Sequence, residues 1–172
     1  MPKDKGNSNE LTFSQARRED LQIAIGILNE VGSWLHDEKG ITDQWARECP
    51  EEPIRRAIES GEFYLIFLES ALAGTVILTE SMERYWKHIR GNALYLRTLA
   101  VKRAYAGQGL GLRIVRWAES MAKEQGKDYL RLDCMAANKR LKQYYIDAGF
   151  DSLDEAPKHH WFALFEKRVN SL

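Results

Sequence analysis

Hydrophobic residues along the chain change their spacing several times, and each change predicts a new element of secondary structure. Residues 11–17 alternate between apolar and polar side chains, as a half-buried strand does. From residue 18 to residue 35 the apolar positions instead recur every three or four residues, which is the spacing of one buried helix face. The same spacing returns after Pro53 and predicts a second, shorter helix. The chain is therefore expected to begin with a strand and two helices.

The rest of the chain alternates between β-rich runs and helical patterns. Residues 62–70 and 71–80 are rich in aromatic and branched side chains around a turn near Ser70, which predicts an antiparallel hairpin. The polar and aromatic stretch at residues 81–92 is expected to form a loop. Further strands are predicted at residues 93–101, 129–135 and 159–169, and further helices at residues 110–122 and 138–149. This order indicates a mixed α/β domain.

Length, charge and cysteine content narrow the classes of function. The 172 residues suit one domain, expected at residues 11–172 after a polar, disordered tail at residues 1–10. Twenty-five basic and 25 acidic residues give a formal net charge of zero, which argues against a nucleic-acid partner. Cys49 and Cys134 lack metal-ligand spacing, so neither a disulfide framework nor a metal site is expected. Without an apolar signal core or membrane span, the expected location is the cytoplasm.

Three glycines, Gly107, Gly109 and Gly111, stand at alternate positions where the chain enters the helix predicted at residues 110–122. Glycine is unfavourable there unless the backbone needs unusual dihedral angles or a close approach to a ligand. The first turn of a helix has unpaired N–H groups and a partial positive charge, so this segment is a candidate anion site. The absence of a Lys-Ser or Lys-Thr pair after the glycines excludes a Walker A loop.

A dinucleotide-binding turn is an alternative interpretation of the glycines. A strand, glycines, a helix and then a strand with Asp133 resemble its layout. Two details disagree with it: the spacing is GxGxG rather than GxGxxG, and the residues KRAYA separate the apolar strand from the first glycine.

Residues 99–115, LAVKRAYAGQGLGLRIV, resemble the acetyl-coenzyme A signature of the GNAT N-acetyltransferases, which joins the fourth strand to a helix. A second family element is similar to Asn138, Tyr145, Gly149 and Phe150, which keep the family's order and spacing. The resemblance covers residues 11–172. It implies the GNAT acyl-CoA N-acyltransferase fold: a mixed, mostly antiparallel central sheet of six to seven strands, with helices on both faces and a V-shaped splay between strands 4 and 5.

The resemblance also implies a binding site for acetyl-CoA, without a metal. Pantetheine would pair with main-chain groups of the fourth strand inside the V, and backbone N–H groups of the glycine segment would hold the pyrophosphate. Ala106 departs from the family, which usually has Arg or Gln there, and Gln108 is a nearby substitute. The implied coenzyme-binding residues are Leu99, Ala100, Val101, Ala106, Gly107, Gln108, Gly109, Leu110, Gly111, Leu112, Asn138, Tyr144 and Tyr145.

Catalytic roles follow from the same resemblance. Tyr145 occupies the position that often protonates the departing thiolate, although core packing is the alternative explanation for this tyrosine. Many relatives carry a Glu on the fourth strand that helps to deprotonate the amine, and here Tyr95 and Arg97 occupy that neighbourhood. Asp133 on the next strand is a candidate base or a structural residue, and His36 is a second candidate base.

The acceptor side of the V is expected to be aromatic. The predicted pocket residues are Trp34, His36, Trp45, Trp86, Tyr95 and Arg97, with the carboxylates of Asp37, Glu38 and Asp43 and the ring of Tyr85 nearby. Such walls suit a small cationic amine, by cation–π contact and charge attraction. Core packing explains Trp34 equally well.

Several functions are compatible with these residues. The favoured one is an acetyl-CoA-dependent N-acetyltransferase that acts on the primary amine of a small molecule by direct transfer in a ternary complex. Acetylation of a protein amine, a coenzyme-binding module without turnover, and a dinucleotide-binding domain are the alternatives. The last strand is apolar on both faces, as in an interior strand or one covered by a partner. A monomer or a homodimer is expected, without nucleic acid or membrane.

Overall fold

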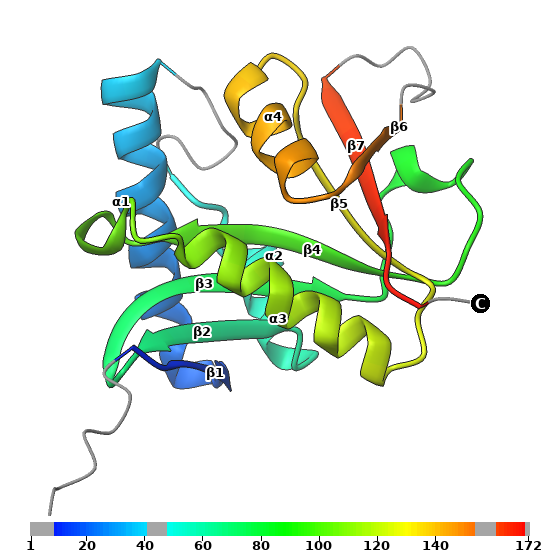
Figure 1. Ribbon diagram of the computed structural model, residues 1–172. Coiled ribbons are helices and arrows are strands. Elements are labelled where there is room, and N and C mark those ends of the chain that lie inside the picture. The colour runs from blue at the N-terminus through cyan, green and yellow to red at the C-terminus, as the bar shows by residue number, and fades with distance from the viewer. Residues whose placement is uncertain (1–8, 41–47, 154–160, 171–172) are drawn as a thin grey trace, which may run out of the picture.

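The computed structural model describes residues 9–40, 48–153 and 161–170, which fold around one seven-stranded sheet (Figure 1). Its strands lie in the order β1-β2-β3-β4-β5-β7-β6. They are β1 (Leu11–Gln15), β2 (Phe63–Leu68), β3 (Ala71–Thr79), β4 (Ala93–Val101), β5 (Tyr129–Met135), β6 (Asp151–Leu153) and β7 (Phe162–Arg168). Neighbouring strands run antiparallel except β4 and β5, which are parallel. The predicted fold class is confirmed.

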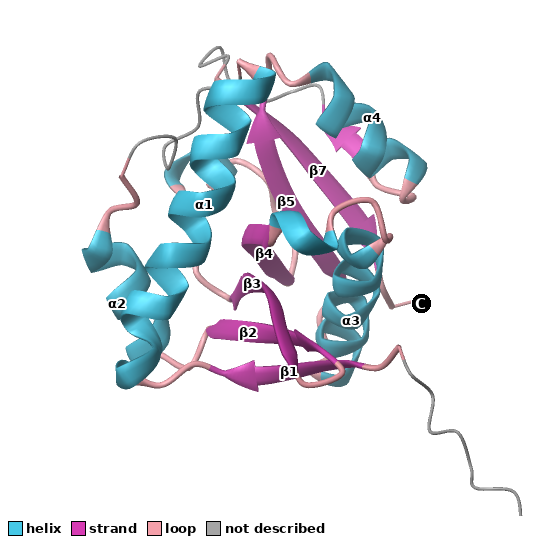
Figure 2. Ribbon diagram, turned by 90° about the vertical axis from the view of Figure 1, so that its left-hand side faces the viewer, coloured by secondary structure: helices cyan, strands magenta, loops and turns pink. Residues whose placement is uncertain are grey.

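Helices cover both faces of this sheet (Figure 2). They are α1 (Leu21–Lys39), α2 (Glu51–Glu59), α3 (Leu110–Glu124) and α4 (Lys139–Asp147). On one face, α1 and α2 share a buried cluster with β2 and β3 that includes Leu28 and Ile77. On the other face, α3 and α4 share a cluster with β4 and β5 that includes Ile114 and Leu130. The alternation of side chains along each strand thus divides the core into two layers.

The predicted elements are present, with differences at their ends. α2 begins at Glu51 rather than after Pro53, because a proline in the first helical turn needs no backbone N–H donor. α1 continues past Leu35 to Lys39 and closes at Gly40, whose φ of 62° is left-handed. The short strand β6 is not predicted, since three residues are too few to show alternation.

The apolar last strand, β7, is an interior strand between β5 and β6. Leu164 and Phe165, whose side chains point to opposite faces of the sheet, are both buried within the chain. This position accounts for its composition without a partner subunit. The choice between a monomer and a homodimer stays a prediction, which light scattering at high micromolar concentration would test.

The ladder between β4 and β5 is short. β4 pairs with β5 only from Ala93 to Tyr95, opposite Tyr129 to Arg131. β4 then continues through residues 96–101 and β5 through residues 132–135, and no pair joins the two strands in these described segments. The strands diverge beyond the paired positions (Figure 1). This is the V-shaped splay that the family resemblance implies.

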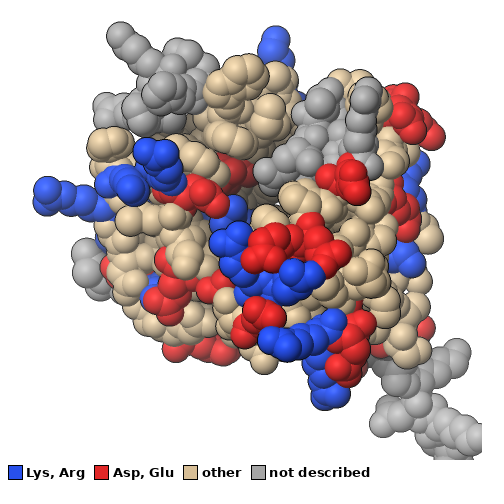
Figure 3. All heavy atoms as spheres, turned by 180° about the vertical axis from the view of Figure 1, so that it is seen from behind, with Lys and Arg blue, Asp and Glu red and all other residues tan. Residues whose placement is uncertain are grey.

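Charges are mixed on the face that carries α1 and α2 (Figure 3). Acidic and basic side chains lie beside one another there, and the ion pairs on α2 join Arg55 to Glu51 and Glu52. Exposed pairs of this kind contribute about 0–1 kcal/mol each to stability. Within residues 9–40, 48–153 and 161–170, no helix has the length and hydrophobicity needed to cross a membrane.

Candidate active site

One edge of β4 faces the opening of the V. On the opposite edge, the N–H of Lys102 donates to the C=O of Ala73 on β3 (2.8 Å). Hydrogen-bonded and non-hydrogen-bonded positions alternate along an antiparallel ladder. Val101 therefore directs its N–H and C=O toward the opening, while Ala100 directs its main-chain groups toward β3. Of the strand residues predicted to pair with pantetheine, Val101 has the orientation that such pairing requires.

A β-bulge in β4 lies beside this position. The β3–β4 register shifts between Thr75 and Ile77, so Thr98 and Leu99 have no ladder partner on β3. Thr98 has a φ of 53°, a left-handed value that a β-branched residue rarely adopts, and its C=O accepts a hydrogen bond from the Thr75 hydroxyl (3.4 Å). A bulge bends its strand and increases the local twist, which accounts for the divergence of β4 from β5.

The glycine segment leads from β4 into α3. Gly107 (φ 76°) and Gly109 (φ 72°) have left-handed backbones, and Gly109 is the residue that precedes the helix. A Cβ added at either position would meet no heavy atom within 4 Å, so the backbone angle rather than crowding requires glycine. Among the described residues, none accepts a hydrogen bond from the N–H groups of residues 107–112. These groups form a cradle that fits an anion such as a pyrophosphate.

Other predicted coenzyme residues contribute through their backbone or shape the surroundings. Leu110 is buried, so only its main chain can face a ligand. The Asn138 Oδ1 accepts a hydrogen bond from the N–H of Leu141 (3.0 Å) and caps α4. Ala106 and Gln108 flank the first glycine at the turn before α3.

Two tyrosines of α4 lie near this cradle. The Tyr144 hydroxyl would be 2.8 Å from a Cβ added to Gly111, so Tyr144 lies against the first turn of α3. Tyr145 is buried, and its ring packs against Phe150 and Phe165. Burial raises the pKa of Tyr145 well above its usual value, so the hydroxyl stays protonated at neutral pH. This position fits a proton donor and also fits core packing.

Asp133 projects from the splayed part of β5 on the opposite face of the sheet. Arg131 pairs with Tyr95, and side chains two residues apart share a face, so Asp133 lies on the same face as Tyr95. Trp86 Nε1 donates to Asp133 Oδ2 (3.3 Å), and the nearby Tyr85, like Trp86, lowers the pKa of this carboxyl. Burial nevertheless raises the pKa of Asp133. A carboxylate with a raised pKa is a stronger proton acceptor than an exposed aspartate.

Two predicted pocket residues, Trp86 and Tyr95, belong to the core and do not form open aromatic walls. Their rings meet edge to face with centroids 5.5 Å apart, and their exposed fractions are 1% and 5%. Trp86 comes from a single 3₁₀ turn, Arg84–Trp86, inside the stretch predicted as a loop. Burial of a tryptophan ring is favourable where its N–H has a partner, and Asp133 is that partner. Trp86 therefore fixes the Asp133 carboxylate by its hydrogen bond, and Tyr95 packs against Trp86.

Glu83 is a residue of this face that sequence reasoning missed. Its carboxylate forms an ion pair with Arg97, and both side chains are more than a third exposed. Both act on Asp133: Arg97 lowers its pKa, and Glu83 raises it. No sequence pattern marks Glu83, since its partner lies in a different element.

The last turns of α1 hold the remaining pocket candidates. The Arg103 guanidinium lies 3.7 Å from the centroid of the Trp34 ring, and Trp34 Nε1 donates to Glu38 (3.1 Å). His36 Nδ1 is buried and has no hydrogen-bond partner among the described residues. Trp45 and Asp43 lie outside the described residues.

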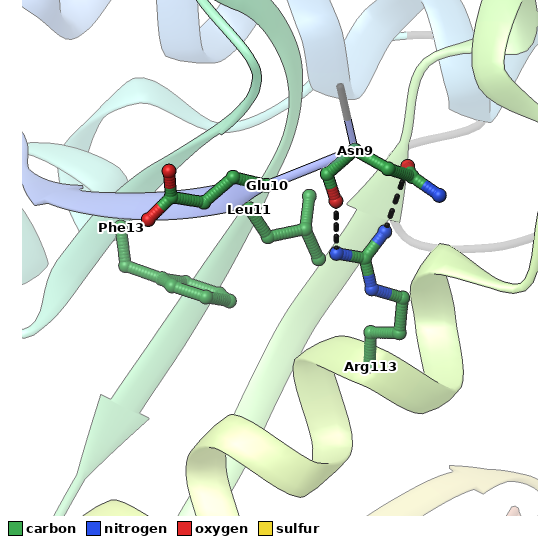
Figure 4. Close-up of a pocket in the computed structure, with 5 residues that line it drawn as sticks. All are labelled: Asn9, Glu10, Leu11, Phe13 and Arg113. Atoms are coloured by element: carbon green, nitrogen blue, oxygen red, sulfur yellow. Dashed lines mark hydrogen bonds between the residues drawn. The ribbon is translucent and has the colours of Figure 1, made fainter. Parts of the chain in front are cut away.

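A hollow of about 520 Å³ lies at the start of β1 and is lined by Asn9, Glu10, Leu11, Phe13 and Arg113 (Figure 4). Arg113 comes from α3, and its guanidinium donates to Oδ1 (3.2 Å) and to the C=O (2.6 Å) of Asn9. Arg113 thus links α3 to the segment just before β1. None of these lining residues is a predicted site residue.

Comparison with known proteins agrees with this geometry. The profile of the Acetyltransferase (GNAT) family matches residues 28–150. The chain belongs to the GNAT acetyltransferase family. It is 30% identical to the uncharacterized N-acetyltransferase YesJ of Bacillus subtilis over 162 residues, which are 89% of this chain and 87% of YesJ.

Solved structures of GNAT acetyltransferases have the same fold. A GNAT acetyltransferase from Listeria monocytogenes superposes with a TM-score of 0.78 at 27% identity, covering 92% of this chain and 94% of that one. The PaiA N-acetyltransferase of Thermoplasma acidophilum, solved with coenzyme A, has a TM-score of 0.71 at 23% identity over 92% of this chain and 99% of its own. A GNAT sheet is mostly antiparallel, unlike the parallel sheet of a dinucleotide-binding domain, so that alternative is set aside.

Proposed function

We propose that this GNAT chain transfers an acetyl group from acetyl-CoA to the primary amine of a small molecule, by direct transfer in a ternary complex. The observation that carries this proposal is the three-pair ladder between β4 and β5. Beyond these pairs, the edge of β4 that faces β5 has main-chain N–H and C=O groups that are free of partners among the described residues. The N–H groups of residues 107–112, the anion cradle, follow at the end of this strand. A ligand that is extended, amide-containing and phosphorylated fits this arrangement, and coenzyme A has these properties.

Main-chain groups hold the coenzyme in this proposal. The N–H groups of residues 107–112 bind the pyrophosphate, and Val101 pairs with the amide groups of the pantetheine arm. Leu99, released from the ladder by the bulge, directs its N–H at the acyl oxygen. Such a donor stabilises the negative charge that develops on that oxygen in the transition state. Acetyl-CoA supplies the activated acetyl group.

In this proposal the coenzyme and the amine enter the V from opposite faces of the sheet. α3 and α4 cover the coenzyme side, so the amine approaches from the face that carries Asp133. Asp133 accepts the proton that the amine loses. The nitrogen–carbon bond then forms as the carbon–sulfur bond breaks, and Tyr145 donates its proton to the departing sulfur. Burial raises the pKa of both groups, which keeps the proton on Tyr145 at neutral pH and makes Asp133 more basic, so each group has the protonation state that its role needs.

A small acceptor fits the described face better than a protein chain does. Trp86 and Tyr95 are buried on this face, and the ion pair of Glu83 with Arg97 lies near Asp133, so the approach to Asp133 is charged. Acetylation of a protein amine is the second candidate within the same family.

A thiol-release assay over a library of amines tests the proposal. We expect free CoA to appear at a rate that depends on one class of amine, with an acetylated amine formed in equal amount by mass spectrometry. Thermal-shift measurements with CoA, acetyl-CoA and NAD run in parallel; a ligand at about 100 times its dissociation constant adds roughly 2.7 kcal/mol. Stabilisation by acetyl-CoA without release of thiol for any amine or peptide would identify a binding module instead. Stabilisation by NAD alone would refute both.

A further inference from the structure

One guanidinium on the acceptor face, that of Arg97, has no part in the proposed transfer. Arg97 pairs with Ile77 in the sheet register, so it lies on the same face as α1 and α2, and it is two residues beyond Tyr95 on β4. This places it just past the point where β4 and β5 diverge. Its side chain is 36% exposed. Arg97 is therefore at the opening of the V and within reach of a ligand.

Arg131, on the neighbouring strand, shows what a structural arginine looks like on the same face. Its side chain is 1% exposed. Its Nε donates to Glu166 (3.0 Å), Nη1 donates to the Tyr95 hydroxyl (3.2 Å), and Nη2 donates to the C=O of Arg90. All three nitrogens have partners. In contrast, the ion pair with Glu83 is the one ion pair or hydrogen bond found for the Arg97 guanidinium among the described residues.

Glu83 holds the place that a carboxylate ligand would take. It belongs to the connection between β3 and β4, and its side chain is 39% exposed. Exposed ion pairs contribute little to stability, because water screens them and both side chains lose freedom. A planar guanidinium can bind the carboxylate of a side chain or of a ligand through the same bidentate pair of hydrogen bonds. A ligand carboxylate can therefore replace Glu83 at small cost.

Arg97 and Asp133 present opposite charges next to one another. They come from the two diverging strands, and Arg97 lies close enough to lower the pKa of Asp133. Asp133 accepts a hydrogen bond from Trp86 and is the proposed acceptor of the amine proton. A molecule with an amine and a carboxylate meets both charges at once. An amine without a carboxylate leaves Arg97 paired with Glu83.

We propose that the acceptor is an amino acid or a similar small molecule that carries both a primary amine and a carboxylate. Arg97 binds its carboxylate in exchange for Glu83, and Asp133 faces its amine. This inference rests on the proposed acetyltransferase function. Arg97 is then a specificity-determining residue, and the Glu83 side chain moves away from it when the acceptor binds.

The test compares a panel of amino acids with their carboxamides, which keep the amine and lose the negative charge. For the accepted side chain, the wild-type protein should have a kcat/KM at least tenfold higher for the acid than for its carboxamide. Arg97→Gln should lose at least tenfold on the acid, through KM, change the rate on the carboxamide far less, and keep its KM for acetyl-CoA. Glu83→Gln should lower the KM for the acid. Arg84→Gln, an exposed arginine of the same connection, is the matched control and should change none of these values.

Three outcomes separate the inference from the function on which it rests. Equal rates on acids and carboxamides, or equal losses on both in a folded Arg97→Gln, would overturn the inference while the acetyltransferase function stands. Absence of turnover on every amine would refute the function. In that case the thermal shift of the CoA-bound protein with the same acids decides: a shift that Arg97→Gln abolishes supports the carboxylate site, and no shift for any acid refutes it.

Discussion

The two halves of the β4–β5 pair differ in how completely their polar groups are satisfied. In the paired half, Ala93 to Tyr95 lie in register with Tyr129 to Arg131, and the buried Arg131 has a partner for each nitrogen. In the splayed half, Val101 turns its main-chain groups to an opening, and Arg97 holds one exposed carboxylate. The paired half thus contributes to stability, whereas the splayed half is the one that we propose binds ligands.

The difference has a local cause. A bulge at Thr98 breaks the β3–β4 register, and the strained φ of this residue persists because the surrounding sheet fixes it. Thr98 and Leu99 therefore have no ladder partner on either neighbouring strand, β3 or β5. Unpaired polar groups are unfavourable in a protein core, so they are expected where a ligand completes them.

The largest expected effect is a loss of stability on substitution of Arg131 in the paired half. Arg131→Met leaves the partly buried Glu166 without its ion-pair partner and removes the N–H group that donates to the Tyr95 hydroxyl. Removing one member of a buried ion pair costs about 3–5 kcal/mol. Urea denaturation should show this loss in the free energy of unfolding. Arg97→Gln is the matched control from the splayed half and should lose less than about 1 kcal/mol. Equal losses in the two variants would remove the distinction between the halves.

The next effect concerns catalysis in the splayed half. Tyr145→Phe deletes one hydroxyl and keeps the packed ring, so stability and acetyl-CoA binding should hardly change. Without its proton donor, kcat should fall about 100-fold, the low end of the range for general acid catalysis. A thiol has a pKa near about 8.5, so the defect should shrink in alkaline buffer, where thiolate leaves unaided. Wild-type turnover in the folded variant would leave Tyr145 with core packing only.

A smaller effect tests the cradle. Gly109→Val forces a branched side chain into a left-handed backbone, which costs about 1–2 kcal/mol, and it narrows the approach to the N–H groups. CoA affinity, measured by calorimetry, should fall by about tenfold or more. Gly126→Val is the matched control, because Gly126 is also left-handed (φ 66°) with open space around its Cβ but lies after the far end of α3. It should lose stability and keep CoA affinity, and unchanged affinity in Gly109→Val would make the glycine segment a simple turn.

The smallest effect is electrostatic. Burial raises the pKa of Asp133, so its carboxyl should titrate above the usual value of about 3.9, and activity should fall as the pH drops through that titration. Arg97→Gln should raise this pKa further, and Glu83→Gln should lower it, because each removes one neighbouring charge. Carbon-detected NMR of the Asp133 carboxyl would measure all three values. An ordinary pKa that neither variant shifts would leave Asp133 with a structural role only.

Much of the fold could be predicted from local patterns. Apolar spacing gave the helices and most strands, and the glycine and Asn138 motifs indicated the family. The misplaced start of α2 and the missing β6 have local causes, a proline tolerated in a first turn and a strand of three residues. These errors leave the site unaffected.

The acceptor face was harder to predict, because it depends on contacts between distant elements. Aromatic residues such as Trp86 and Tyr95 suit either a pocket wall or a core. Their burial here depends on hydrogen bonds to Asp133 and Arg131, which lie about 40 residues away in sequence. No sequence motif marks Glu83, and its role depends on the ion pair with Arg97 on β4. The cradle was predictable because its chemistry is carried by consecutive residues of one segment.

Amide hydrogen exchange of the full chain with and without acetyl-CoA tests the central claim most directly. Saturating acetyl-CoA should slow exchange at Val101 and at residues 107–112, whose N–H groups have no partner among the described residues, and leave the paired half at Leu94 and Leu130 unchanged. Protection that is uniform over the sheet, or binding of acetyl-CoA without protection at Val101 and the glycine segment, would contradict the assignment of the splayed half as the coenzyme site.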